Sequence, residues 1–513
     1  MPRSFNVAGP CKPDIHYLLP PLRRLPELRR LIDGQNYFVL HAPRQCGKTT
    51  TLLTLAQALT AEGGYAAVVL SCEAAAPFSD DPERLEQALL ASWRSQTRSW
   101  LPEPLQPPEW TEEAPGARVV GALSAWARSC PRPLVVFLDE IDALYGQGLL
   151  SVLRQLRSAF PTRPTGFPWS LCLCGLRDVR DYKVASGGSA HLGTSSPFNI
   201  KSESLTLRGF TRDEVAELYG QHTEETGQVF EPAAVDRAWH LTQGQPWLVN
   251  ALARQCVEVF VTDGRPVNAA DIDTAKERLI QRQDTHLDSL AERLREDRVR
   301  RVIEPIIAGT WMGDIPEDDF RFVVDLGLIR TDGGTRIANP IYQEIIPRVL
   351  AATTTRSLPA AVPTWLRPDG SLDPDALLSA FVAFWRQHGE PLMRSAPYHE
   401  IAPHLVLMAW LHRLVNGGGT IEREYAIGSG RMDLCVRFAG AVLPIELKVW
   451  RPGEPDPREE GLEQLDGYMA GIGSPKGWLV VFDRREGLGR LATRTSVEPG
   501  RTPSGRVVAV VRA

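Results

Sequence analysis

Two carboxylates and one ammonium group stand at close spacing near the C-terminus of this chain. Asp433 is followed, after an apolar stretch with the pattern of a hairpin, by Glu446-Leu447-Lys448. Because side chains alternate along a strand, Glu446 and Lys448 are expected on one face and Leu447 on the other. A divalent cation takes oxygen ligands, and a water that attacks beside it gains from a nearby positive charge. The pattern therefore indicates metal-assisted hydrolysis at a sheet edge.

The spacing Asp-x12-Glu-x-Lys resembles the core of PD-(D/E)XK nucleases. The resemblance implies that Asp433 and Glu446 bind Mg²⁺ together with the carbonyl of Leu447. It implies that Lys448 orients the attacking water or helps to deprotonate it. It also implies a further metal ligand, Glu400, on an expected helix over 398–415.

A second element of the same resemblance follows the hairpin. Gln464 and Tyr468 match the Gln-x-x-x-Tyr helix of some branches of that fold. At positions i and i+4 the two side chains share one helix face, so both can point to the same site. A charged hairpin edge without activity is the alternative, because this fold also occurs in modules that bind DNA or are structural and do not cleave.

A phosphate-binding loop is indicated near the N-terminus, between an expected strand over 37–41 and an expected helix. Its residues are Ala42, Pro43, Arg44, Gln45, Cys46, Gly47, Lys48, Thr49 and Thr50. In such a loop, backbone N–H groups cradle phosphates, Lys48 neutralises the β- and γ-phosphates and the Thr49 hydroxyl binds Mg²⁺. Ala42 stands where the pattern has Gly, and this small residue fits if its φ is negative.

An apolar run over 134–138 leads into Asp139-Glu140, as in a Walker B strand. Asp139 is expected to hold Mg²⁺ through water, and Glu140 to polarise the hydrolytic water. A buried strand that meets a solvated acidic turn is the alternative, but the loop upstream favours the nucleotide site. ATP and Mg²⁺ are the expected cofactors, and either ATP hydrolysis or ATP as a structural ligand fits the sequence.

The order of these motifs is similar to that of bacterial STAND/AAA-type ATPases over roughly residues 5–350. That resemblance implies a helical lid and a winged helix after the P-loop core. It places Gly244 and Pro246, from a Gly-x-Pro turn of the lid, near the nucleotide. It also suggests Arg177 and Arg180, which follow an expected strand over 170–174, as phosphate sensors, with ordinary surface ion pairs as the alternative.

The expected fold is α/β: a P-loop NTPase with a doubly wound parallel sheet, a helical lid and a winged helix, followed by a PD-(D/E)XK-like α/β domain. Strands over 37–41, 66–70, 134–138 and 170–174 that alternate with helices predict the parallel sheet. Thr211–Glu214 resembles a capping box at the start of the lid. The expected parts are an N-terminal arm 1–30, an ATPase core 31–205, a lid 206–285, a winged-helix-like part 286–350, a linker 351–375 and a nuclease-like domain 376–513.

Composition narrows the class of protein. The 513 residues are 43% hydrophobic and 23% charged, as in ordinary globular proteins, and the net charge of −5 does not make the whole chain a nucleic-acid binder. Eight cysteines without paired metal spacing fit reduced thiols in the cytoplasm. Neither a signal peptide nor a long apolar run is evident, so no membrane segment is expected.

These patterns predict a regulatory ATPase that controls a Mg²⁺-dependent nuclease domain. The C-terminal domain is expected to bind nucleic acid, with DNA favoured, and a homo-oligomer is compatible with the AAA-type core. By analogy with similar fusions, the pathway would be defence against foreign DNA. The alternative is a signalling or scaffold protein that oligomerises with ATP and whose C-terminal domain binds nucleic acid or a partner without cleaving it.

Overall fold

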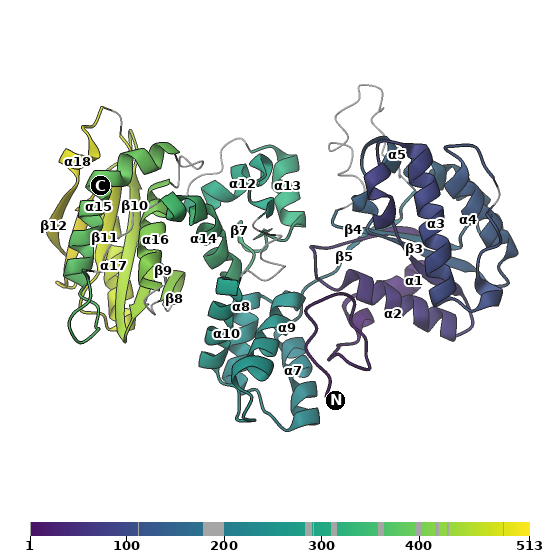
Figure 1. Ribbon diagram of the computed structural model, residues 1–513, viewed down its shortest axis with the longest axis horizontal. Helices are drawn as coiled ribbons and strands as arrows, with labels where there is room; N and C mark the ends of the chain where they lie inside the picture. Colours follow the sequence, from purple (N-terminus) through teal and green to yellow (C-terminus); the bar gives the residue numbers. More distant parts are fainter. Residues whose placement is uncertain are drawn as a thin grey trace. The chain divides into compact units, whose positions relative to one another are not determined.

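The structure is a computed structural model that describes residues 2–110, 112–177, 200–282, 290, 292–308, 315–357, 364–395, 402–415, 420–427, 430–485 and 487–513. These residues form two compact units (Figure 1). The first unit is Met1–His286 with Pro316–Asn339, and the second is Leu287–Ile315 with Pro340–Ala513. None of the helices in the described ranges has the length and apolarity to cross a bilayer.

The first unit is built on a parallel sheet of five strands in the order β2-β3-β4-β1-β5. The strands are β1 (Tyr37–His41), β2 (Ala66–Ser71), β3 (Leu134–Asp139), β4 (Ser170–Gly175) and β5 (Glu203–Thr206). The four strands expected from the sequence are confirmed, as is the parallel α/β class. The fifth strand, with the sequence Glu-Ser-Leu-Thr, is polar and short and gave no signal.

Alternating side chains of these strands enter two separate cores, because helices cover both faces of the sheet (Figure 1). Val136 and Leu138 pack with α3 (Pro82–Trp100), α4 (Arg118–Ser129) and α5 (Gly146–Ala159). Val135 and Phe137 pack on the opposite face with α1 (Glu27–Asp33) and α2 (Lys48–Ala61). Burial of each such side chain stabilises the fold by about 2 kcal/mol, so the sheet holds its strand ends in fixed register.

The part of the first unit that is expected to form a lid is a bundle of helices, and the name lid is kept for it here. Its helices are α7 (Arg212–Thr226), α8 (Pro232–Thr242), α9 (Pro246–Gln255) with the π-helical turn η7 (Cys256–Phe260), and α10 (Ala269–Arg282). The expected capping box is confirmed: the Thr211 hydroxyl accepts from the Glu214 amide, and the Glu214 carboxylate accepts from the Thr211 amide.

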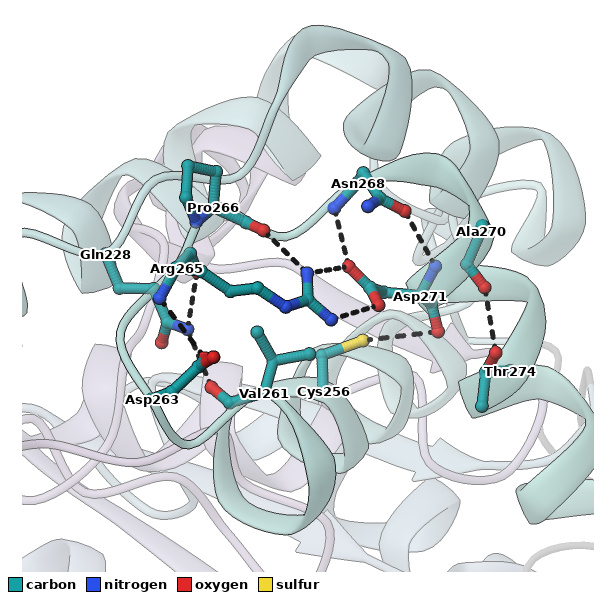
Figure 2. A network of polar contacts seen from close by, with 10 residues as sticks. All are labelled: Gln228, Cys256, Val261, Asp263, Arg265, Pro266, Asn268, Ala270, Asp271 and Thr274. Atoms are coloured by element: carbon teal, nitrogen blue, oxygen red, sulfur yellow. Dashed lines mark hydrogen bonds and ion pairs between the residues drawn. The ribbon is translucent and has the colours of Figure 1, made fainter.

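A second cap, at α10, carries a polar network that ties the lid together (Figure 2). Asn268 and Asp271 accept each other's backbone N–H at 3.1 and 2.9 Å. The guanidinium of Arg265 donates to both oxygens of Asp271 at 2.7 Å. The guanidinium of Arg265 and the backbone N–H of Asn268 both stabilise the charged form of the Asp271 carboxylate. The stability of this part of the lid therefore depends on the ionisation of Asp271.

The N-terminal arm runs through Ser4–Tyr17 and packs on the lid. The phenol of Tyr17 is buried, lies 3.1 Å from His222 on α7 and packs against the ring of Phe5. Tyr17 therefore serves as an aromatic anchor for the arm.

Residues 316–339 belong to the first unit, although the expected winged-helix-like part 286–350 is wider. They contain α13 (Glu317–Asp325) and a short hairpin of β6 (Ile329–Arg330) and β7 (Arg336–Ile337). The neighbouring helices α12 (Asp297–Ala308) and α14 (Pro340–Ser357) group with the second unit. The helices and the hairpin follow one another in the order expected for a winged helix. However, α13 and the hairpin belong to the first unit, whereas α12 and α14 belong to the second.

The second unit has a mixed sheet of six strands in the order β12-β13-β11-β10-β9-β8. The strands are β8 (Thr420–Ile427), β9 (Gly430–Phe438), β10 (Ala441–Trp450), β11 (Trp478–Asp483), β12 (Ser496–Arg501) and β13 (Val507–Arg512). Besides α12 and α14, this unit contains the helices α15 (Pro374–Ser395), α16 (Ala402–Val415), α17 (Arg458–Ile472) and the short α18 (Leu491–Arg494). The expected hairpin is antiparallel β9–β10, and the expected strand over 478–482 is β11, parallel to β10.

The expected linker 351–375 contains secondary structure and core residues. Helix α14 continues to Ser357, and α15 begins at Pro374. Between them, Trp365 and Leu372 are buried in the core of the second unit. The run of Thr, Pro and Ala shows no apolar period in the sequence, so composition alone suggested a linker.

Candidate functional site

The phosphate-binding loop connects the end of β1 to the start of α2, as the sequence predicted. Gln45 and Gly47 adopt left-handed conformations, with φ of 58° and 90°, whereas Ala42 is not among the residues with positive φ. Such alternation turns successive N–H groups to one side and forms an anion-binding concavity. The ammonium of Lys48 donates to the carbonyls of Ala42 at 2.7 Å and Pro43 at 2.9 Å, so it spans the loop.

The hydroxyl of Thr49 and the carboxylate of Asp139 meet beneath this loop. Thr49 Oγ1 donates to Asp139 Oδ2 at 2.6 Å, although β4 lies between β3, which ends at Asp139, and β1, which precedes the loop. Asp139 is almost fully buried, and its second oxygen accepts from the Glu140 amide at 3.0 Å. The hydroxyl oxygen of Thr49 and the carboxylate oxygen of Asp139 are close enough to bind one small divalent cation. Mg²⁺ fits this pair, because it takes hydroxyl, carboxylate, water and phosphate oxygens as ligands.

Glu140 stands at the end of β3 with a left-handed backbone, φ 57°. Its carboxylate accepts from the hydroxyl of Ser71, which ends β2, at 3.1 Å. Partial desolvation raises the pKa of Glu140, and the charges of Glu73 and Asp139 raise it further. A carboxylate with a raised pKa is a better proton acceptor, which suits the polarisation of a hydrolytic water.

Arg24 is a cation at the loop that sequence reasoning missed. Its guanidinium donates to the carbonyls of Cys46 at 3.1 Å and Arg208 at 2.9 Å. It also lies over the ring of Phe210, 5.0 Å from the centroid. Arg24 therefore connects the phosphate-binding loop to the segment that begins the lid. No sequence signal pointed to it, because all its partners are distant along the chain.

The Gly-x-Pro turn contacts this same segment. The carbonyl of Gly244 accepts from the amide of Phe210 at 2.7 Å. Gly244 has φ +75°, and a Cβ added there would meet the Phe210 carbonyl oxygen at 1.9 Å. Pro246 follows as the buried first residue of α9. The turn and Arg24 therefore both contact Phe210. The expected role of the turn beside the nucleotide stays a prediction.

Arg177 lies past the end of β4, where the resemblance places a phosphate sensor. Its side chain is almost fully buried, with the guanidinium 3.9 Å from the centroid of Phe322 and Nε 3.7 Å from Asp325 Oδ2. Both partners belong to α13, so the described contacts of Arg177 run to that helix. Its role as a sensor stays a prediction, and Arg180 lies outside the described residues.

The same 316–339 segment touches the loop and the lid. A Cβ added at Gly327 would lie 2.6 Å from Cγ of Pro43 in the phosphate-binding loop. Arg330 donates to the side-chain oxygen of Gln243, beside the Gly-x-Pro turn, at 3.1 Å. Three parts of the nucleotide region therefore contact one segment.

In the second unit, β9 and β10 bring the C-terminal carboxylates together. The pair Leu434–Ile445 is in antiparallel register, so Asp433 and Glu446 follow at opposing positions. Asp433 Oδ2 accepts from the amide of Leu447 at 2.8 Å. The hairpin predicted from the sequence therefore places Asp433 beside the backbone between Glu446 and Lys448.

Glu446 is only 2% exposed, and burial raises its pKa to about 8, with Asp433 adding to the rise. Within the described parts of the chain, its Oε2 atom is buried without a hydrogen-bond partner. A buried carboxylate oxygen of this kind fits a cation ligand, because an unpaired buried acceptor is otherwise costly.

The described residues contain no group of three or more His, Cys, Asp or Glu side chains placed to hold a metal ion. Of the predicted carboxylates, Asp433 and Glu446 lie at opposing positions of the hairpin, and their role as metal ligands stays a prediction. The third, Glu400, lies outside the described residues.

The ammonium of Lys448 lies among three acceptors. It is 3.2 Å from Glu446 Oε1, 3.1 Å from Glu460 Oε1 and 2.7 Å from Gln464 Oε1. Burial alone would lower the pKa of Lys448, but the two carboxylates outweigh it and raise the pKa. Lys448 is therefore held as a cation.

The two residues expected to share a face of α17 differ in their contacts. Gln464 accepts from Lys448, whereas Tyr468 is buried and packs against Cys435 on β9. Sequence reasoning missed Glu460, although it lies four residues before Gln464, where helix geometry puts it on the same face. It also missed Ser71, which parallel register places opposite Asp139.

Comparisons with known proteins agree with the nucleotide site. Residues 30–182 match the family described as "AAA domain". A search of curated proteins found no match. The P-loop, the Walker B strand and this family match together identify an ATP-binding P-loop module of the AAA type over residues 30–182.

Solved structures with similar folds come from several organisms. A Walker-type ATPase of Pyrococcus abyssi aligns with 67% of this chain and 99% of its own, at 15% identity and TM-score 0.47. The ORC2 protein of Aeropyrum pernix aligns with 65% and 93%, at 16% identity and TM-score 0.40. The RuvB Holliday junction branch migration motor of Thermotoga maritima aligns with 63% and 92%, at 18% identity and TM-score 0.34. These similarities are too distant to transfer an activity.

Proposed function

We propose that this protein is an ATP-regulated nuclease, in which the AAA-type module controls Mg²⁺-dependent phosphodiester hydrolysis by the second unit. DNA is the favoured substrate. The finer assignments made from the sequence belong to the same proposal: a STAND-type arrangement with a winged helix, a PD-(D/E)XK-like second unit, assembly into a homo-oligomer and a role in defence against foreign DNA.

The observation that supports the nuclease is the oxygen of Glu446 described above. It is buried and lacks a hydrogen-bond partner among the described residues, beside Asp433 and two positions before Lys448. Structural ion pairs are usually fully hydrogen-bonded when buried. A site that keeps a buried acceptor unpaired next to a second carboxylate is better suited to a cation.

Each residue of this site has one task in the proposed reaction. Asp433 and Glu446 would hold Mg²⁺, which polarises the phosphoryl oxygen and acidifies a bound water. Lys448, kept charged by its neighbours, stabilises negative charge that develops on the attacked phosphate or orients the water. Leu447 contributes its carbonyl and buries its side chain in the core.

In the first unit, Lys48 would neutralise the phosphates, with Thr49 and Asp139 as the Mg²⁺ partners. Glu140 would act on the hydrolytic water. The backbone N–H groups of the loop and of the start of α2 supply the remaining donors for phosphate.

The test is cleavage of labelled DNA and RNA by the full chain, with and without Mg²⁺ and ATP. The Asp433→Ala and Glu446→Ala variants should cleave at least ~10²-fold more slowly, a modest part of what a metal supplies to a transition state. Glu463→Ala, which changes an exposed carboxylate on α17, should cleave like the wild type.

Two results would count against the proposal. Cleavage at the wild-type rate by the Asp433→Ala/Glu446→Ala double variant would assign the activity to a contaminant or to another site. A wild-type chain that binds DNA but does not cut under any nucleotide condition would favour the alternative, an ATP-driven scaffold with a binding module at its C-terminus.

A further inference from the structure

The ammonium of Lys448 has three N–H donors, and three side-chain acceptors lie within hydrogen-bonding distance. One acceptor, Glu446, is a predicted metal ligand on the same strand. The other two, Glu460 and Gln464, come from the first turns of α17 and are joined by a bond from Gln464 Nε2 to Glu460 Oε1 at 3.1 Å.

Close packing of α17 on the sheet brings this pair to Lys448. Gly461 follows Glu460 in the helix, and a Cβ added at Gly461 would lie 2.5 Å from a methyl of Leu479 and 3.4 Å from Cγ of Lys448. A larger residue at 461 would push the helix outward and lengthen both contacts to the ammonium. The position of Glu460 is therefore fixed by the sheet beneath it.

We propose that Glu460 is a positioning residue that, with Gln464, keeps the ammonium of Lys448 directed to the reacting water or phosphate when a divalent cation takes over Glu446. This inference rests on the proposed nuclease function of the Asp433, Glu446 and Lys448 site.

Donor counting gives the physical reason. While Lys448 serves three acceptors, it has no N–H left for substrate. A divalent cation that binds Glu446 takes over that carboxylate, and one N–H of Lys448 becomes available. The contacts to Glu460 and Gln464 persist, so the ammonium stays in place instead of moving with Glu446.

Without Glu460, Lys448 would retain Gln464 and its ion pair with Glu446. Because Glu446 is buried, this pair would strengthen and compete with the cation for the same carboxylate. Glu460 itself is exposed over 65% of its side chain, so its surface ion pair contributes little to folding. The Glu460→Ala variant should therefore fold normally.

The first experiment measures Mg²⁺-dependent cleavage by wild type, Glu460→Ala and the matched control Glu463→Ala, which changes an exposed carboxylate on the same helix. Glu460→Ala should lower kcat about 10-fold, raise the Mg²⁺ concentration for half-maximal rate, and leave KM for nucleic acid unchanged. Glu463→Ala should match the wild type. A loss that appears only in KM, or equally in both variants, would overturn the proposal.

A double variant tests whether Glu460 acts through Lys448. Adding Glu460→Ala to Lys448→Ala should cause no further loss of kcat, because the ammonium that Glu460 positions is already absent. A further loss of about 10-fold in the Lys448→Ala background would show an independent role and overturn the proposal.

A second readout does not need cleavage. Acylation of Lys448 by an amine-reactive ester, followed by peptide mass spectrometry, reports how firmly the amine is held. Glu460→Ala should be acylated several-fold faster than wild type and Glu463→Ala, while equal rates would overturn the proposal. If Lys448 responds as expected but the wild type cuts nothing, the positioning role holds and the nuclease function fails.

Discussion

Lys48 joins the two sides of its loop, since one ammonium donates to the carbonyls of both Ala42 and Pro43. Replacement by Ala removes these bonds and the main cationic partner of the β- and γ-phosphates. The Lys48→Ala variant should therefore lose ATP binding, with affinity reduced at least ~100-fold. Calorimetric titration with ATP is the measurement, and Lys476→Ala in the second unit is the control. Wild-type affinity in Lys48→Ala would disprove the phosphate-binding loop.

Glu140 should separate ATP binding from hydrolysis. Glu140→Gln keeps the size of the side chain and its contact with Ser71, but an amide polarises water poorly. ATP affinity should stay near the wild-type value, while phosphate release should fall at least ~10²-fold. Hydrolysis at the wild-type rate would remove Glu140 from the reaction.

Gly244 should tolerate no side chain, because of both its φ of +75° and the Phe210 carbonyl 1.9 Å from an added Cβ. We expect Gly244→Ala to lower the free energy of unfolding by at least about 2 kcal/mol. Gly220→Ala, inside α7 with open space around its Cβ, should raise it by about 0.5–1 kcal/mol. The measurement is thermal unfolding of both variants, and equal changes in their unfolding free energy would contradict this prediction.

At the scale of elements, the α10 cap makes lid stability depend on pH. Hydrogen bonds from Arg265 hold the pKa of Asp271 below its usual range. A folded pKa below the unfolded value of about 3.9 gives stability that is present above that value and lost as pH falls through the folded pKa. Asp271→Ala should cost about 2 kcal/mol at neutral pH, and the difference from wild type should shrink toward pH ~3.

The matched control for that experiment is Asp273→Ala, also on α10. Asp273 pairs with Arg237 at 2.7 Å, but its side chain is 43% exposed and caps no helix. Its loss should cost less than about 1 kcal/mol. The measurement is calorimetric unfolding of both variants at several pH values. Equal losses of unfolding free energy with the same pH dependence would contradict the stabilising role of the Asp271 cap.

Elements with a strong local signal were predictable from the sequence. Four strands of the first sheet are apolar runs buried on both faces, and the Thr211–Glu214 box carries its own hydrogen-bond pattern. The strand β12 was missed because its sequence, Ser-Val-Glu-Pro-Gly-Arg, holds Pro and Gly, which weaken the sequence signal of a strand.

Site residues divide in the same way. The alternation of Glu446 and Lys448 follows from one strand and could be predicted, whereas Arg24 and its partners depend on packing between distant segments. The contacts of Arg177 with α13 have the same origin, because no sequence period reports which helix reaches a strand end. Glu460 was missed although it lies between these cases: the i, i+4 spacing to Gln464 places both on one helix face, but the contact with Lys448 depends on packing.

At the scale of the whole molecule, the proposal requires that the state of the first unit affects cleavage by the second. ATP should change the cleavage rate of the wild type, and Lys48→Ala should abolish that response while Asp433 and Glu446 remain intact. Glu446→Ala should remain inactive with or without ATP. Identical rates for wild type and Lys48→Ala in both conditions would show that the two units act independently.

The chain passes between the two units three times, since Pro316–Asn339 packs with the first unit between two stretches that pack with the second. Its contacts near Pro43, Arg177 and Gln243 are therefore made by a segment tethered at both ends. Its binding to the nucleotide region is set by an effective local concentration, and dilution of the protein cannot release it. A chain that ends directly after Asn339 would keep this segment but lose one of its two tethers, so it would report weaker docking of the segment than the intact protein has.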